Sequence, residues 1–121
     1  MKLGVELHFD ASHSIPAHEG KCKNIHGHTY TVEVIVQGRV EKKTRMILDY
    51  LILKKLVAEV LDELDHEYLN DIIGYATSER IAQHIYKAVK AKLKHYEVEL
   101  LSVQLWEGQG KWVKIEKGDE G

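Results

Sequence analysis

The chain has 121 residues, a length that suits one domain, and its formal net charge of −2 gives no strong bias toward either sign. Hydrophobic residues at 44% are enough for an ordinary core, and charged residues at 30% describe a soluble surface. The lysines are dispersed, with no basic stripe interleaved with aromatic residues, so no nucleic-acid partner is expected. A single cysteine excludes an intramolecular disulfide, and neither a signal core nor a membrane-length apolar run is present. These features predict a cytoplasmic protein without membrane contact.

The first third of the chain predicts two strands joined by a loop. Apolar and polar residues alternate over residues 3–9 and again from about His26 to Gly38. In the second segment, His28, Tyr30 and the valines that follow share one face. The stretch Ser12–Asn24 contains the only proline and mixed charges, which is typical of a loop.

The rest of the chain predicts two helices and two more strands. Asp49 can cap a helix that ends near Asp65–His66, and after a connector over residues 67–76 Thr77 can cap a second helix. Strands are expected over residues 99–107 and 111–116, joined by a glycine-rich turn. The order ββααββ predicts an α+β fold in a single domain over residues 1–121, with two helices on one face of a four-stranded antiparallel sheet. Its edge strands invite pairing with other subunits.

Three histidines are candidates for a metal site. His26 and His28 are two residues apart on an expected strand, so both rings lie on one face, and His13 lies just past the first strand. If the two strands pair, the three rings converge, and three His ligands with an open fourth position are typical of catalytic zinc. A half-exposed strand that is merely rich in histidine is the alternative. Four other histidines are not expected to be ligands: His8, His18, His84 and His95.

Cys22 stands four residues before His26 and has two possible roles. It could close the metal site as a fourth ligand, or act beside the metal as a free thiol. Lys21 and Lys23 flank it and favour the thiolate, which is the reactive form. Because the surrounding loop is polar, the usual alternative of a buried, inert cysteine is disfavoured.

Two further groups suggest proton transfer and ligand binding. Asp65 followed by His66 at a helix end could be a general acid/base pair, or a surface histidine interacting with the helix dipole. Glu107 ends the expected inward face of Leu101, Val103 and Leu105, where a carboxylate needs a partner. A ligand with two adjacent N–H donors, such as the edge of a pterin ring, would suit it; a solvated strand end is the alternative.

Taken together, these residues resemble the 6-pyruvoyltetrahydropterin and 6-carboxytetrahydropterin synthase family. The similar segments, in family order, are Phe9-Asp10-Ala11-Ser12-His13, Cys22-Lys23-Asn24-Ile25-His26-Gly27-His28, Leu48-Asp49-Tyr50, Leu64-Asp65-His66-Glu67-Tyr68-Leu69-Asn70, Thr77-Ser78-Glu79 and Trp106-Glu107. They span nearly the whole chain. The three residues between Cys22 and His26 match the carboxy branch. Ala76 stands where the family often has proline, and the short loop over residues 14–21 leaves the triphosphate contacts unassigned.

The resemblance implies a fold, a site and an assembly. It implies a tunnelling-type fold with Zn²⁺ on His13, His26 and His28, and Cys22 as the general base. Asp65 and His66 are implied as a proton relay. Glu107 is implied as the pterin anchor, with Thr77 and Ser78 lining the ring. It further implies a homohexamer built as a dimer of trimers, with active sites between subunits.

The implied activity is that of a zinc-dependent lyase. The substrate would be 7,8-dihydroneopterin triphosphate, and the products 6-carboxy-5,6,7,8-tetrahydropterin, acetaldehyde and triphosphate, an early step toward queuosine-type deazaguanines. Pyruvoyl-type or aldolase activity and a non-catalytic pterin or purine binder are the alternatives. A cupin barrel is disfavoured, because Glu33 falls on the opposite strand face from His28 and the two helices do not suit an all-strand barrel.

Overall fold

The computed structural model describes residues 1–119 and consists of one sheet and the helices that cover it. The elements are β1 (Lys2–His13), a 3₁₀ turn η1 (Lys21–Lys23), β2 (His26–Gly38), α1 (Tyr50–Asp62), α2 (Leu69–Ile73), α3 (Ser78–Lys92), β3 (Val98–Glu107) and β4 (Trp112–Glu116). The strands pair antiparallel in the order β1-β2-β3-β4. This confirms the predicted α+β architecture and excludes the cupin barrel.

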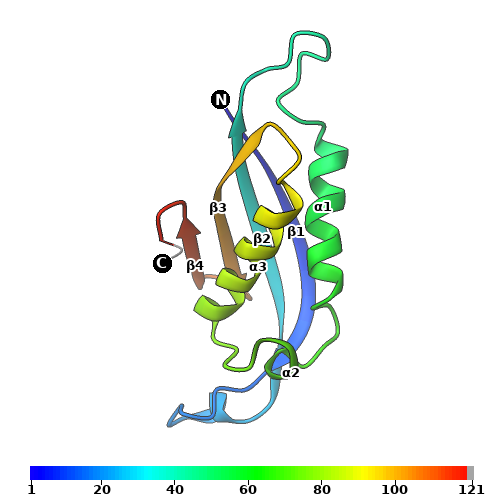
Figure 1. Cartoon of the computed structure of the whole chain (residues 1–121). Coiled ribbons are helices and arrows are strands. Elements are labelled where there is room, and N and C mark those ends of the chain that lie inside the picture. Colours follow the sequence, from blue (N-terminus) through cyan, green and yellow to red (C-terminus); the bar gives the residue numbers. More distant parts are fainter. Residues whose placement is uncertain (120–121) are drawn as a thin grey trace.

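The two long helices lie on one face of the sheet (Figure 1), with α1 against β1 and α3 against β3 and β4. Asp49 and Thr77 cap them as predicted, each side chain accepting a backbone N–H of the first turn. Alternate residues of β2, from Tyr30 to Val36, are fully buried beneath the helices. No helix within residues 1–119 is long and apolar enough to cross a membrane.

Two predicted boundaries were wrong. β1 continues to His13 instead of ending at Phe9, because the pairing with β2 runs without a break from Lys2↔Gln37 to His13↔His26. Long-range pairing thus orders a segment whose own sequence is loop-like. The expected connector over residues 67–76 contains the short helix α2, which ends at Gly74 with a φ of 83°.

A β-bulge in β3 overturns part of the predicted inward face. Val36 pairs with Leu100 and the adjacent Ile35 pairs with Ser102, so Leu101 is an extra residue without a partner on β2. Leu100 is therefore buried where Leu101 was expected to be, while Val103 and Leu105 face the core as predicted. After the bulge, inward and outward residues of β3 alternate regularly again, so Glu107 lies on the same helix-covered face as Val103 and Leu105.

Candidate metal centre

Three histidine rings meet at the end of the β1–β2 pair. His13 lies opposite His26 in the strand register, and His28 follows on the same face of β2. One ring nitrogen from each of the three lies within 4.8 Å of the others. The His13 ring is fully buried, and the other two are partly buried. The fold therefore brings together the three residues that the sequence grouped.

The hydrogen bonds of these rings suit a bound metal ion. Nδ1 of His13 lies 2.7 Å from the carbonyl oxygen of Ala76, and Nδ1 of His26 lies 2.8 Å from that of Asn24. Because a carbonyl only accepts, both Nδ1 atoms carry a proton, and in the neutral form of each ring Nε2 then keeps the lone pair that a metal ion needs. Within residues 1–119, Nε2 of His13 and Nε2 of His28 are buried without a hydrogen-bond partner. Such orphaned nitrogens are expected where a metal ion binds.

Glu107 lies beside this histidine group. Its Oε1 is 3.2 Å from Nε2 of His28, in a geometry that does not align a hydrogen bond, and its Oε2 is 3.9 Å from Nε2 of His13. Ser78, the first residue of α3, donates its hydroxyl to Oε2 at 2.8 Å, and Lys111 approaches Oε1 at 3.4 Å. The predicted inward carboxylate thus has protein partners.

These contacts shift the pKa values of Glu107 and His28. Burial acts to raise the pKa of Glu107, but the Ser78 hydrogen bond and the nearby His28, His13 and Lys111 outweigh it, so the pKa is lowered. Burial lowers the pKa of His28 despite the opposing charge of Glu107. An ionised carboxylate and a neutral imidazole follow, which are the forms needed to accept N–H donors and to ligate a metal.

Tyr30 is a member of this neighbourhood that the sequence interpretation placed only in the core. It is fully buried, stacks on Phe9 at 4.9 Å and meets the edges of the His13 and His28 rings. Its hydroxyl has no hydrogen-bond partner among the residues that the structure describes. Burial, and to a smaller extent the charge of Glu107, raises the pKa of Tyr30. The sequence could have indicated that Tyr30 lies beside the histidines, because it stands two residues after His28 on the same face of the strand.

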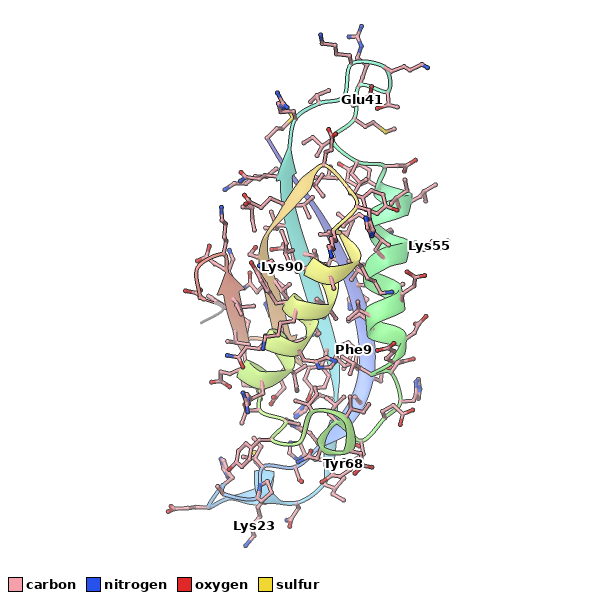
Figure 2. All side chains as sticks on the ribbon, in the orientation of Figure 1. Phe9, Lys23, Glu41, Lys55, Tyr68 and Lys90 are labelled. Carbon is pink, nitrogen blue, oxygen red and sulfur yellow. The ribbon has the colours of Figure 1, made fainter. Side chains whose placement is uncertain are left out.

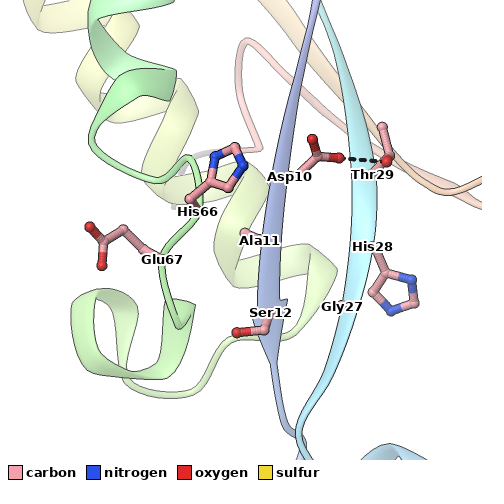
Figure 3. A pocket seen from close by; sticks show the side chains of 8 residues that line it. All are labelled: Asp10, Ala11, Ser12, Gly27, His28, Thr29, His66 and Glu67. Carbon is pink, nitrogen blue, oxygen red and sulfur yellow. Dashed lines mark hydrogen bonds between the residues drawn. The ribbon is translucent and has the colours of Figure 1, made fainter.

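Asp65 and His66 form a second group on the outer side of β1, that is, along the edge of this strand that faces away from β2. His66 Nδ1 lies 2.9 Å from Asp65 Oδ2, and the ring is largely exposed. They gather with Asp10, not with the three histidines. A pocket of about 490 Å³ is lined by His66, Glu67, His28 and residues of β1 and β2. Figure 3 shows His66 on one side of β1 and His28 on β2 beyond it, with Thr29 hydrogen-bonded to Asp10.

Cys22 lies in η1, partly buried, in the loop between β1 and β2. It does not belong to the group of ring nitrogens formed by His13, His26 and His28. Of the two predicted lining residues, Ser78 reaches Glu107, whereas Thr77 caps α3 by accepting the N–H of Arg80. A single chain therefore joins the histidines, Glu107 and Ser78. Neither Cys22 nor the Asp65–His66 pair belongs to the histidine group, although His66 and His28 line the same pocket.

Comparison with known proteins gives a consistent result. A family model described as 6-pyruvoyl tetrahydropterin synthase matches residues 2–118. The chain is 37% identical over 117 residues to a putative 6-carboxy-5,6,7,8-tetrahydropterin synthase of Archaeoglobus fulgidus, with 97% of this chain and 96% of the relative covered. It is 39% identical over 108 residues to the dihydroneopterin monophosphate aldolase of Pyrococcus furiosus, with 89% and 90% covered.

Among solved structures, the 6-pyruvoyl tetrahydropterin synthase of Caenorhabditis elegans superposes with a TM-score of 0.85 at 26% identity, over 96% of this chain and 94% of that one. The family model and the Archaeoglobus relative both extend over almost the full length of the chain. On these grounds, the chain belongs to the 6-pyruvoyl tetrahydropterin synthase family.

Proposed function

We propose that the protein is a zinc-dependent lyase that converts 7,8-dihydroneopterin triphosphate to 6-carboxy-5,6,7,8-tetrahydropterin, with loss of acetaldehyde and triphosphate. The coarser assignment, a lyase-type enzyme of pterin chemistry, rests on family membership and on the relatives named 6-carboxy-5,6,7,8-tetrahydropterin synthase. The observation that supports zinc and the binding of a pterin is the meeting of three imidazoles and Glu107 at one end of the sheet. The spacing of Cys22 and His26 favours the carboxy product.

His13, His26 and His28 would hold the zinc ion. Three neutral imidazoles are a usual donor set for catalytic zinc, although other divalent ions accept the same ligands. The backbone carbonyls of Ala76 and Asn24 hold two of the rings in the ligating tautomer. The chemistry that zinc supplies in such a site is Lewis-acid polarisation of a substrate oxygen.

Glu107 would bind the pterin ring. An ionised carboxylate accepts the two adjacent N–H donors of the ring edge in a bidentate arrangement. Ser78 fixes the carboxylate from the side of α3, and Lys111 contributes positive charge. The ring then lies next to the histidine group, which would direct the substrate's side chain toward the metal. Thr77, which precedes Ser78, would line the same ring.

Proton transfer is assigned to Cys22, Asp65 and His66. The Cys22 thiolate would take a proton from a side-chain carbon next to the ring, and His66, oriented by Asp65, would move protons to and from the side-chain oxygens. Since Asp65–His66 lies on the outer side of β1, a homohexamer with sites between subunits would allow the pair to serve a neighbouring chain. Cytoplasmic location and a place in queuosine biosynthesis belong to the same proposal.

The Pyrococcus relative supports a second candidate, an aldolase that acts on dihydroneopterin monophosphate. Its identity to this chain is comparable to that of the Archaeoglobus relative, so identity does not separate the two reactions. The same acid–base groups and metal could cleave the substrate's side chain in either the synthase reaction or the aldolase reaction. A pyruvoyl-type product is the third outcome, in keeping with the family model.

The deciding experiment is an anaerobic incubation of zinc-loaded protein with the triphosphate and, in parallel, with the monophosphate, with products read by mass spectrometry. We expect 6-carboxytetrahydropterin and acetaldehyde from the triphosphate. A pyruvoyl product, or turnover of the monophosphate alone, would move the assignment to that branch. Zinc binding without turnover of either substrate would leave a pterin binder and contradict the proposed activity.

A further inference from the structure

Residues 65–70 run alongside the end of β1 and bond to alternate residues there, namely Asp10, Ser12 and, just past the strand, Ser14. The backbone N–H of Asp10 donates to Asp65 Oδ1 at 3.0 Å, and the Asp10 carbonyl accepts the N–H of His66 at 2.6 Å. Two residues later, the N–H of Ser12 donates to the carbonyl of Glu67 at 3.0 Å. This ladder closes the exposed edge of β1 where the strand reaches His13.

Asn70 extends the ladder with its side chain. The N–H of Ser14 donates to Asn70 Oδ1 at 3.0 Å, and Asn70 Nδ2 donates to the carbonyl of Ser14 at 2.8 Å. Only one orientation of the amide satisfies both bonds, so the side chain imitates a peptide group of a paired strand. The Ser14 hydroxyl and the Tyr68 hydroxyl, 2.6 Å apart, form a third link. The backbone of Ser14, next to His13, is held from α2.

Ser14 is connected to Cys22 through the next residue of the chain. Ile15, the neighbour of Ser14, donates its N–H to the carbonyl of Cys22 at 2.8 Å. Hydrogen bonds from Asn70 to Ser14, the peptide bond from Ser14 to Ile15, and the hydrogen bond from Ile15 to Cys22 thus connect α2 to the segment that carries the thiol. Figure 2 places Tyr68, near the start of α2, at the same end of the molecule as Lys23, the neighbour of Cys22.

We propose that Asn70 is a positioning residue for the Cys22 loop, residues 14–24: its amide fixes Ser14, and through Ile15 it fixes the place of the thiol. The inference rests on the proposed function only in treating Cys22 as the base. The same ladder carries Asp65 and His66 at its other end.

The test is the variant Asn70→Ala, measured well below its melting temperature. Because Cys22 is the only cysteine, its rate of alkylation by iodoacetamide reports on one thiol without ambiguity. We expect alkylation of Cys22 and hydrogen exchange of the Ile15 amide to rise by about tenfold, the factor for loss of two hydrogen bonds from a local structure. With substrate, kcat should fall while KM stays near its original value, since Glu107 and Ser78 are untouched.

Asp49→Ala is the matched control, because it destabilises the protein elsewhere. Asp49 accepts the N–H of Leu51 as the N-cap of α1, so its loss lowers the melting temperature without touching the Cys22 loop. Faster alkylation in Asn70→Ala alone supports the proposal. Unchanged rates in Asn70→Ala, or equal increases in both variants, would overturn it.

The outcome does not depend on the reaction. Alkylation and hydrogen exchange require no substrate, so they report on the positioning role even if the chemistry is of another kind. If Cys22→Ala keeps full turnover, the assignment of Cys22 as the base fails while the positioning role of Asn70 is judged on its own measurements.

Discussion

At the scale of single residues, the Asp65–His66 pair is set up to hold a proton. The hydrogen bond and the charge of Asp65 raise the pKa of His66, with a smaller contribution from Asp10. In turn, the N–H of Asp10 and the His66 ring lower the pKa of Asp65. His66 also has a φ of 60°, an uncommon backbone conformation held by its N–H bond to Asp10.

A histidine NMR titration should therefore find the midpoint of His66 above the ordinary value. Since the folded pKa is raised, this histidine's contribution to stability is complete below the ordinary histidine pKa and is lost as the pH rises through the folded value. Asp65→Asn should bring the midpoint down. Glu67→Gln, which removes a neighbouring charge that does not contact the ring, is the control. Equal shifts in the two variants would contradict the specific role of Asp65.

Because the buried hydroxyl of Tyr30 has no partner among the described residues, we expect its removal to stabilise the protein, whereas most substitutions in a core destabilise it. A buried hydroxyl without a partner costs about 1–3 kcal/mol, so Tyr30→Phe should raise the melting temperature of the free protein by several degrees. Tyr86 is the matched control, because it is equally buried but its hydroxyl donates to the carbonyl of Leu100 at 3.5 Å. Tyr86→Phe should not stabilise. Calorimetry of both variants decides, and a lower melting temperature for Tyr30→Phe would contradict the prediction.

Glu107 should dominate ring binding through its charge. Glu107→Gln keeps the size of the side chain but loses the ionised acceptor, so pterin affinity should fall about tenfold to a hundredfold. Glu99→Gln is the control on the same strand, where the carboxylate is paired with Lys117 on the surface. Titration calorimetry with a pterin measures both. Equal affinity in Glu107→Gln and the original protein would remove the anchor role.

At the scale of elements, the sequence predicted the sheet and the long helices, because hydrophobic periodicity and caps are local signals. It also grouped the three histidines whose rings the β1–β2 pairing brings together. It missed the bulge at Leu101, since an extra residue in a strand leaves an apolar pattern of nearly the same appearance. It missed α2 because five residues give too short a pattern. That Asp65 and His66 group with Asp10 and not with the histidines depends on tertiary geometry, which no local pattern encodes.

The turn after α2 predicts that alanine destabilises the protein more at Gly74 than at Gly27. Gly74 has a φ of 83°, which disfavours any residue with a Cβ, so Gly74→Ala should lower the free energy of unfolding by about 1–2 kcal/mol. Gly27→Ala should cost less, because the nearest atom to an added Cβ is 3.6 Å away and φ is not positive. Urea unfolding of the two variants tests this. A larger cost at Gly27 would contradict the role of backbone conformation.

At the scale of the whole molecule, one chain holds two separate groups of candidate site residues. The helices cover one face of the sheet. Asp65 and His66 belong to the segment after α1 and lie on the outer side of β1, where the His66 ring is largely exposed. An exposed acid–base pair works poorly when water surrounds it, so burial by a neighbouring chain would complete it. This is the physical reason to expect that Cys22 and His66 of one active site come from different chains.

Mixing two inactive variants tests that expectation. Cys22→Ala and His66→Ala should each lose turnover, because each removes a proton-transfer group. If the two groups serve a site from different chains, co-refolding them in equal amounts should restore about one quarter of the original activity, the fraction of sites that receive both intact groups by random assembly. Mixing the separately assembled proteins without refolding is the control and should restore little. Absence of recovery in co-refolded samples that bind zinc normally would mean that one chain supplies both groups.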